Sequence, residues 1–168
     1  MKTHRWQNAN VVATVGDRRW LWQFKRAGAR IELHADQAVA LTSRLPAAVV
    51  NRTVRDLWQP RLNVAWLPSS QVFIRVVQLP PCEPAEVHAM VEFQLETLCP
   101  LPLAQAVWTT HVMQSSGKNG LTAIVIMVPR SFVEQYLGEL EGVGYVPDRL
   151  DVPFLAELLS APVQGDEV

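Results

Sequence analysis

The fold is decided by the stretch at residues 63–81, which reads NVAWLPSSQVFIRVVQLPP. Residues 63–67 form an apolar run that ends at a Pro-Ser-Ser turn, and residues 72–79 form a second apolar run that ends at two prolines. Short apolar runs bounded by turn residues predict strands. Two strands are therefore expected here, and the turn between them is expected to separate two parts of the chain.

The pattern that follows this stretch predicts a helix, two strands and a second helix. Apolar residues recur at helical spacing after Pro84, namely Val87, Val91, Leu95 and Leu98. Residues 106–113 and 121–128 predict two strands, and 121–128 is apolar at nearly every position, as in a strand covered on both faces. A helix is expected from Ser131 to Gly142, and a strand at 149–152.

The residues before the stretch predict a three-stranded antiparallel meander and a helix. Strands are expected at 11–15, around 20–24 and around 31–33, because apolar and polar side chains alternate between the turns at Gly16 and Gly28. Residues 46–59 predict a helix, because Val50, Val54, Leu57 and Trp58 share one helical face and Pro60 ends it. The fold class is therefore α/β, of the α+β kind.

Composition excludes several classes of function. Of the 168 residues 49% are hydrophobic, and 15 basic residues balance 16 acidic ones. A nucleic-acid partner is not expected, because a surface that binds nucleic acid needs a clustered excess of basic residues. The longest apolar runs fall far short of the roughly 18 residues of a membrane span. Residues 1–10 are polar and unlike a secretory signal, so a cytoplasmic location is expected.

No catalytic or metal-binding constellation is evident in the sequence. None of the four histidines has a Cys, Asp or Glu at metal-ligand spacing, so no metal site is expected. A ribonuclease-H-like nuclease would need a carboxylate on the first strand, and residues 11–15 contain none. Both observations argue against an enzyme.

An ordered set of motifs resembles a known family. They are VAWLPSS (64–70), VFIR (72–75), MVEFQLE (90–96), GYVP (144–147) and DVPFL (151–155). In this order and spacing the chain is similar to the actin-like assembly proteins PilM of type IV pili and, more distantly, to the cytoplasmic part of GspL of type II secretion. The resemblance implies a ribonuclease-H/actin-like half-fold with a small inserted strand-helix-strand-strand-helix subdomain.

The resemblance also implies a domain organisation. Residues 10–70 and the return segment 146–160 would form the actin-like core subdomain. Residues 71–145 would form the inserted subdomain, and residues 161–168 a flexible tail.

The function implied by the resemblance is that of a non-enzymatic scaffold at the cytoplasmic face of the inner membrane. Such a scaffold would bind a PilN-like peptide or an assembly ATPase through a groove between its two subdomains, so its association with the membrane would be indirect. The candidate partner-binding residues are Val72, Phe73, Arg75, Leu79, Pro80 and Pro81.

The chain departs from the family at the phosphate loop of the first hairpin. The Asp-x-Gly motif of the pilus proteins corresponds here to Thr14-Val15-Gly16, followed by Asp17. Thr14 replaces the Mg²⁺-linked carboxylate, so the loop formed by Thr14, Gly16 and Asp17 is degenerate, and Arg18 and Arg19 beside it are expected to be solvated. We expect neither ATP hydrolysis nor a cofactor. ATP and Mg²⁺ become candidates only under the alternative hypothesis, in which this chain is the first half of a nucleotide-binding actin-like ATPase.

Overall fold

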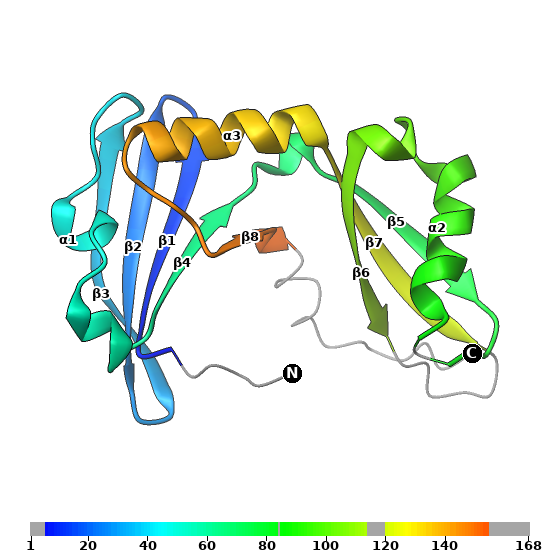
Figure 1. Ribbon diagram of the computed structural model, residues 1–168, viewed down its shortest axis with the longest axis horizontal. Coiled ribbons are helices and arrows are strands. Elements are labelled where there is room, and N and C mark those ends of the chain that lie inside the picture. The colour runs from blue at the N-terminus through cyan, green and yellow to red at the C-terminus, as the bar shows by residue number, and fades with distance from the viewer. Residues whose placement is uncertain (1–5, 84, 114–119, 155–168) are drawn as a thin grey trace, which may run out of the picture. The chain divides into compact units, whose positions relative to one another are not determined.

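The computed structural model describes residues 6–83, 85–113 and 120–154, and it contains two β-sheets (Figure 1). The chain divides into two compact units, of which the second is Ser70–Tyr136 and the first comprises the residues before and after it. The elements in chain order are β1 (Asn8–Val15), β2 (Arg18–Ala27), β3 (Arg30–Ala40), α1 (Ala47–Val50), the 3-10 helix η1 (Val54–Leu57), β4 (Arg61–Trp66), the 3-10 helix η2 (Ser69–Gln71), β5 (Phe73–Leu79), α2 (Val87–Leu98), the 3-10 helix η3 (Leu103–Gln105), β6 (Ala106–Met113), β7 (Leu121–Pro129), α3 (Arg130–Gly142) and β8 (Arg149–Asp151).

The first unit is built on a five-stranded sheet in the order β3-β2-β1-β4-β8. Strands β1, β2 and β3 pair antiparallel, which confirms the predicted meander. Strand β4 pairs parallel to β1, and β8 pairs parallel to β4. Parallel neighbours need a crossover connection. The chain between β3 and β4 supplies one crossover, and the chain that contains the whole second unit supplies the other.

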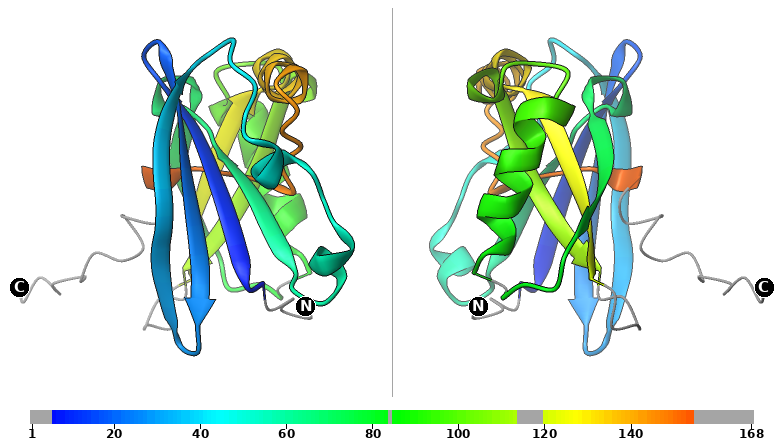
Figure 2. Two further views of the ribbon diagram at one scale, coloured as in Figure 1. Left: turned by 90° about the vertical axis from the view of Figure 1, so that its left-hand side faces the viewer. Right: turned by 90° about the vertical axis from the view of Figure 1, so that its right-hand side faces the viewer.

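One face of this sheet is covered by α1 and by the second half of α3 (Figure 2). The face presents Val12, Leu21 and Ala65, which have no solvent exposure. The residues that complete this core include Val49 of α1 and Tyr145, which follows α3. Each large apolar side chain buried in this way stabilises the fold by roughly 1.5–3 kcal/mol.

The helix predicted over residues 46–59 is wrong in its extent. The α-helix ends at Val50, and the later apolar positions Val54 and Trp58 are 76% and 81% exposed. The side chain of Arg61 donates hydrogen bonds to the carbonyls of Ala48 (2.8 Å) and Asn51 (2.9 Å). These carbonyls would otherwise accept the next bonds of a continuing helix. The hydrogen bonds from Arg61 therefore stabilise the end of the helix at Val50.

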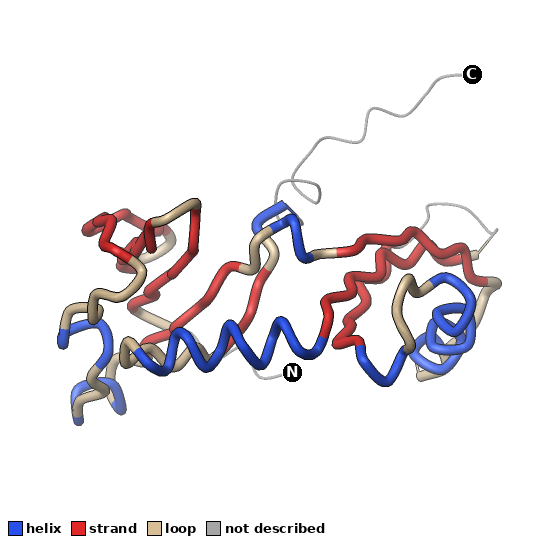
Figure 3. The backbone as a smooth tube through the Cα atoms, turned by 90° about the horizontal axis from the view of Figure 1, so that it is seen from above, coloured by secondary structure: helices blue, strands red, loops and turns tan. Residues whose placement is uncertain are grey.

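The second unit is a three-stranded antiparallel sheet in the order β5-β7-β6, with α2 along one face (Figure 3). Val87, Val91 and Leu95 of α2 are buried, as their spacing predicted, whereas Leu98 is 41% exposed. They pack against buried residues of the sheet, which include Val77, Leu79, Ala123, Val125 and Met127. Residues 123–128 of β7 are all buried, so the prediction of a strand covered on both faces is confirmed.

The second compact unit begins at Ser70, and the inserted subdomain is predicted from the sequence to begin at residue 71. The second unit ends at Tyr136, inside α3, rather than at residue 145. Physically, the turn after α3 belongs to the first unit, because the carbonyl of Val143 accepts a hydrogen bond from the N–H of Leu45. The predicted tail, residues 161–168, lies outside the described residues. Within the described ranges no helix has the length and apolar character that a membrane span needs.

Candidate functional site

The turn between β1 and β2 brings together the three residues predicted to form a degenerate phosphate loop. Thr14 lies near the end of β1, Gly16 has a left-handed φ of 61°, and Asp17 is exposed beside it. Across the strand pair, Thr14 faces Arg19. This pairing places a guanidinium next to the position at which the PilM-like motif would carry a carboxylate.

Arg19 is buried, which corrects the expectation that it is solvated. The residue is only 2% exposed, and its Nη1 donates a 2.7 Å hydrogen bond to the carbonyl of Leu41. Its Nε and the Oγ1 of Thr14 are buried without a hydrogen-bond partner among the described residues. A buried cation repels Mg²⁺ strongly, because the local dielectric is low. The hairpin therefore carries a buried positive charge beside Thr14.

The six residues predicted to bind a partner all lie in the second unit, but they differ in exposure. The structure leaves Arg75, Pro80 and Pro81 exposed and Val72 and Phe73 half-buried. Leu79 is only 3% exposed and belongs to the core under α2, and Phe73 packs against that core. Leu79 is therefore a packing residue that a partner cannot reach, which corrects its place among the predicted contacts.

The register of β5 explains this division. Arg75 and Leu79 lie opposite Val125 and Leu121 of β7, so the odd-numbered positions of β5 point to the face that α2 covers. The even-numbered positions point to the other face, which is the one that residues 122, 124, 126 and 128 of β7 share.

Apolar side chains of the two outer strands are exposed or half-buried on that other face. We call it the open face and define it by Ile74, Val76, Val107 and Met113. Val76 is 61% exposed, Val107 39% and Met113 36%. The sequence reasoning missed Ile74 and Val76 because the run 72–77 is apolar at five of six positions and does not alternate.

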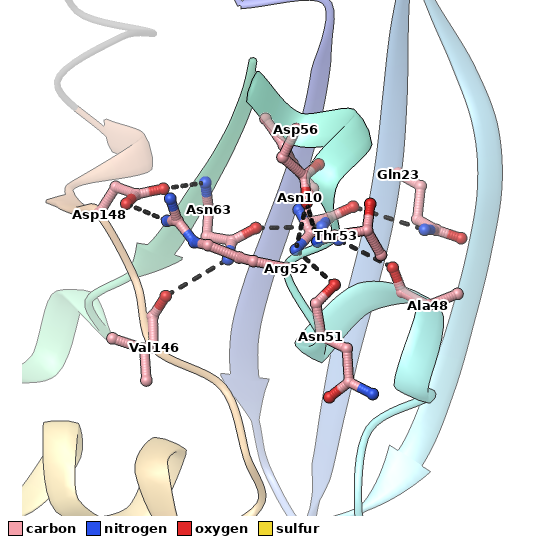
Figure 4. Close-up of polar contacts among 11 residues, drawn as sticks. Asn10, Gln23, Ala48, Asn51, Arg52, Thr53, Asp56, Asn63, Val146 and Asp148 are labelled. Atoms are coloured by element: carbon pink, nitrogen blue, oxygen red, sulfur yellow. Dashed lines mark hydrogen bonds and ion pairs between the residues drawn. The ribbon is translucent and has the colours of Figure 1, made fainter. Parts of the chain in front are cut away.

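A polar pocket of about 450 Å³ lies in the first unit, between the sheet and residues 48–61. A row of side-chain amides crosses three adjacent strands beside it (Figure 4). Gln23 donates to Asn10 (3.4 Å), Asn10 donates to Asn63 (3.1 Å), and Asn63 donates to the carbonyl of Val146 (3.3 Å). Asn10 and Asn63 are 3% and 2% exposed. Buried amides need such partners, so the row is a structural network.

The charged groups around the amide row hold two loops against the sheet. The carboxylate of Asp148 accepts a 2.9 Å hydrogen bond from the backbone N–H of Asn63 and pairs with Arg52 (Figure 4). Arg61 holds the end of α1, and its guanidinium lies 3.6 Å from the carboxylate of Asp56. No group of three or more His, Cys, Asp or Glu side chains in the described part of the chain could hold a metal ion. The network could have been suspected from isolated asparagines in apolar strands.

A scan against protein-family models found no match, and neither did a search of curated proteins. Solved structures with a similar fold were found. One is the PilM-PilN type IV pilus biogenesis complex, with a TM-score of 0.66 and 20% identity over 90% of this chain and 49% of that chain. Another is the cytoplasmic domain of EpsL, an inner membrane component of the type II secretion system of Vibrio cholerae. Its TM-score is 0.54, with 18% identity over 85% of this chain and 56% of that chain.

These similarities define the fold of the chain. The chain spans about half the length of the two solved proteins. At 18–20% identity the likeness concerns the backbone and not the individual site residues. The resemblance expected from residues 63–155 is confirmed at the level of the fold: the chain has an α+β fold similar to that of these two solved structures.

Proposed function

We propose that this chain is a non-enzymatic component of a type IV pilus or type II secretion assembly platform, where it acts as a scaffold for partner proteins. The observation that carries the proposal is the fold shared with PilM, which was solved as a complex with PilN. The likeness to the cytoplasmic domain of an inner-membrane secretion component supports the same class of function. In this role the chain works in the cytoplasm and reaches the inner membrane through its partners.

The chemistry of the β1–β2 hairpin supports a scaffold rather than an ATPase. The hydroxyl of Thr14 stands at the motif position of the carboxylate, and the buried guanidinium of Arg19 lies opposite it on β2. Neither group can coordinate Mg²⁺ as a hard anionic oxygen ligand does. The chain is therefore proposed to need no nucleotide and no metal. The alternative, a nucleotide-binding actin-like ATPase, predicts saturable binding of Mg·ATP, and calorimetry with the purified chain distinguishes the two.

The partner-binding surface is proposed to be the open face of the second unit, together with the exposed residues at the end of β5. Large apolar side chains exposed on one face of a sheet are typical of interaction surfaces. Val76 and Val107 are exposed on this face, one on each outer strand of the sheet, and the exposed prolines Pro80 and Pro81 follow β5. The proposed partner is a PilN-like peptide, a short cytoplasmic segment of a membrane protein, which would bury these side chains.

The test is site-specific photocrosslinking in the native cell. Benzoylphenylalanine at Val76 is expected to crosslink to a membrane protein of a pilus or secretion platform, through that protein's cytoplasmic segment. The matched control is the same substitution at Phe93, which is 76% exposed on α2 and remote from the open face in the β5-β7-β6 sheet. A crosslink from Phe93 but not from Val76 would contradict the proposed surface. No crosslink to a platform protein from either position would contradict the proposed function.

A further inference from the structure

The α1 side of the five-stranded sheet changes character along its strands. Toward the β1–β2 hairpin it is apolar, with Val12, Leu21 and Ala65 fully buried. Toward the start of β1, two neighbouring rows of polar side chains cross the strands β2, β1 and β4: Lys25, Asn8 and Arg61, and then Gln23, Asn10 and Asn63. A covered sheet face is ordinarily apolar, so the polar half of this face needs a reason of its own.

The polar rows border the pocket of about 450 Å³, whose opposite wall comes from residues 48–59. Among the described residues that line this pocket, only Phe24 and Ala48 are apolar. Pockets for small molecules are usually lined mainly by apolar side chains, with a few polar groups that fix orientation. This pocket therefore suits a ligand that is polar over most of its surface.

Several polar groups on the floor of the pocket have no partner within the described residues. The side chains of Asn8 and Lys25 form neither a hydrogen bond nor an ion pair there. Gln23 donates to Asn10, and its own side-chain oxygen, on the far side from Asn10 in Figure 4, accepts no hydrogen bond from a described residue. The floor thus offers an ammonium donor, an amide donor and an amide acceptor to a bound molecule.

A bulge in β3 adds a fourth polar group at the rim of the pocket. Leu33 and Ala35 lie opposite consecutive residues of β2, so His34 between them is an extra residue in the strand. His34 is exposed and lines the pocket. Bulges commonly re-aim a side chain in this way beside functional sites.

The charges that line the pocket favour an anion with a single negative charge. Arg61 and Asp56 offset each other, because the guanidinium and the carboxylate are 3.6 Å apart. Lys25 is exposed, and Glu32, which lies opposite it on β3, forms no ion pair with it. With His34 neutral, the described lining therefore holds one positive charge that is not offset. Charge complementarity then selects a carboxylate rather than a dianionic phosphate.

We propose that this pocket binds a small hydroxylated monocarboxylate of the sugar-acid class. Its carboxylate would accept hydrogen bonds from Lys25 and Asn8, and a hydroxyl would donate to the side-chain oxygen of Gln23. A volume of about 450 Å³ holds about 15 waters at roughly 30 Å³ each, which is room for a ligand of about a dozen non-hydrogen atoms. The pocket lies at the start of β1, roughly 25 Å along the strand from the turn at Gly16, so it is separate from the degenerate phosphate loop.

Titration of the ¹⁵N-labelled full chain tests the proposal with three probes: D-glucuronate, D-glucose and D-glucose 6-phosphate. In ¹H–¹⁵N spectra, glucuronate is expected to shift the side-chain amide signals of Asn8 saturably, with a dissociation constant of about 1 mM for a ligand of this size. Glucose, which lacks the carboxylate, is expected to bind about tenfold more weakly. Glucose 6-phosphate is expected to bind more weakly than glucuronate, and the side-chain amide of Gln94 in the second unit should not shift with any probe.

Three variants locate the binding site. Lys25→Met is expected to raise the dissociation constant of glucuronate about tenfold, because a charge-assisted hydrogen bond is lost. Arg26→Met removes the same charge from the next residue, whose side chain lies on the other side of the sheet, and is expected to change the constant less than about twofold. Asn8→Asp places a carboxylate on the floor of the pocket and is expected to abolish binding. The rest of each spectrum shows whether the variant is folded.

Each opposite result would overturn the proposal. One is the absence of a saturable shift at about 20 mM glucuronate, well above the expected dissociation constant. Another is glucose binding as tightly as glucuronate, or glucose 6-phosphate binding more tightly, because the single carboxylate would then not be what the pocket recognises. Equal effects of Lys25→Met and Arg26→Met, or undiminished binding by folded Asn8→Asp, would place the ligand outside this pocket.

Discussion

The hydroxyl of Tyr145 donates a 2.9 Å hydrogen bond to the backbone carbonyl of Asn10, a residue 135 positions earlier in the chain. The same hydroxyl lies 3.1 Å from the carbonyl of Val64, and the tyrosine side chain is fully buried. One side chain after α3 therefore contacts both central strands, β1 and β4. This contact ties the return segment of the chain to the sheet of the first unit.

Replacing Tyr145 by phenylalanine should destabilise the first unit without changing its fold. The variant keeps the ring but removes the donor, so two buried carbonyls lose a partner. The expected loss is about 1–2 kcal/mol in the free energy of unfolding. Urea unfolding followed by tryptophan fluorescence measures this loss. The slope of the free energy of unfolding against urea concentration should stay unchanged. A variant as stable as the original chain would show that the ring alone makes the contribution.

The amide row predicts a non-additive pair of substitutions. Asn63→Ala leaves the buried amide of Asn10 without its acceptor, and the expected cost is about 1–3 kcal/mol. Asn10→Ala leaves the buried side-chain carbonyl of Asn63 without its donor. Because each single change removes the same hydrogen bond, the double variant should cost less than the sum of the two, by about 0.5–1.5 kcal/mol. Strict additivity in a double-mutant cycle would mean that the two amides do not interact.

Gly120 and Gly138 should respond to alanine in opposite directions. Gly120 has a φ of 110°, and a Cβ there would collide with the carbonyl oxygen of Leu79. Gly120→Ala should therefore destabilise the second unit by about 1–3 kcal/mol. Gly138 lies inside α3 with open space around its Cα. Gly138→Ala should raise the free energy of unfolding by about 0.5–1 kcal/mol, because alanine has a higher helix propensity than glycine. Thermal unfolding of both variants checks the pair.

Adjacent valines of β5 should differ sharply in their tolerance of charge. Val76 is 61% exposed on the open face, whereas Val77 is 2% exposed under α2. Val76→Lys should change stability by less than about 1 kcal/mol, while Val77→Lys should unfold the second unit, because an unpaired ammonium would be buried. Circular dichroism and unfolding curves measure the contrast. Equal damage from both substitutions would mean that the open face is covered in solution.

The order of the strands could be predicted from the sequence because its causes are local. Turn residues such as Gly16 and Gly28 separate runs with strand periodicity, and the stripe Val87, Val91, Leu95 has helical spacing. These signals depend on residues a few positions apart. The observed meander, the strand-helix-strand-strand order of the second unit and the second face of β7 agree with them.

The end of α1 could not be predicted in the same way. Val54 and Trp58 continue the helical spacing of Val50, yet both are exposed, because Arg61 takes the carbonyls of Ala48 and Asn51. That capture depends on where β4 places the arginine side chain. Periodicity carries no information about such a contact.

The sequence by itself determined the order of strands and helices, apart from the extent of α1, and with it the α+β class and the likeness to the PilM and GspL fold. The tertiary structure alone decided which side chains the sheets bury. Arg19 is buried because its strand position faces Thr14 and the carbonyl of Leu41, and Leu79 is buried because the register of β5 turns it toward α2. The physical reason is that strand pairing joins residues distant in sequence, and a shift of one residue would exchange the two faces of a strand.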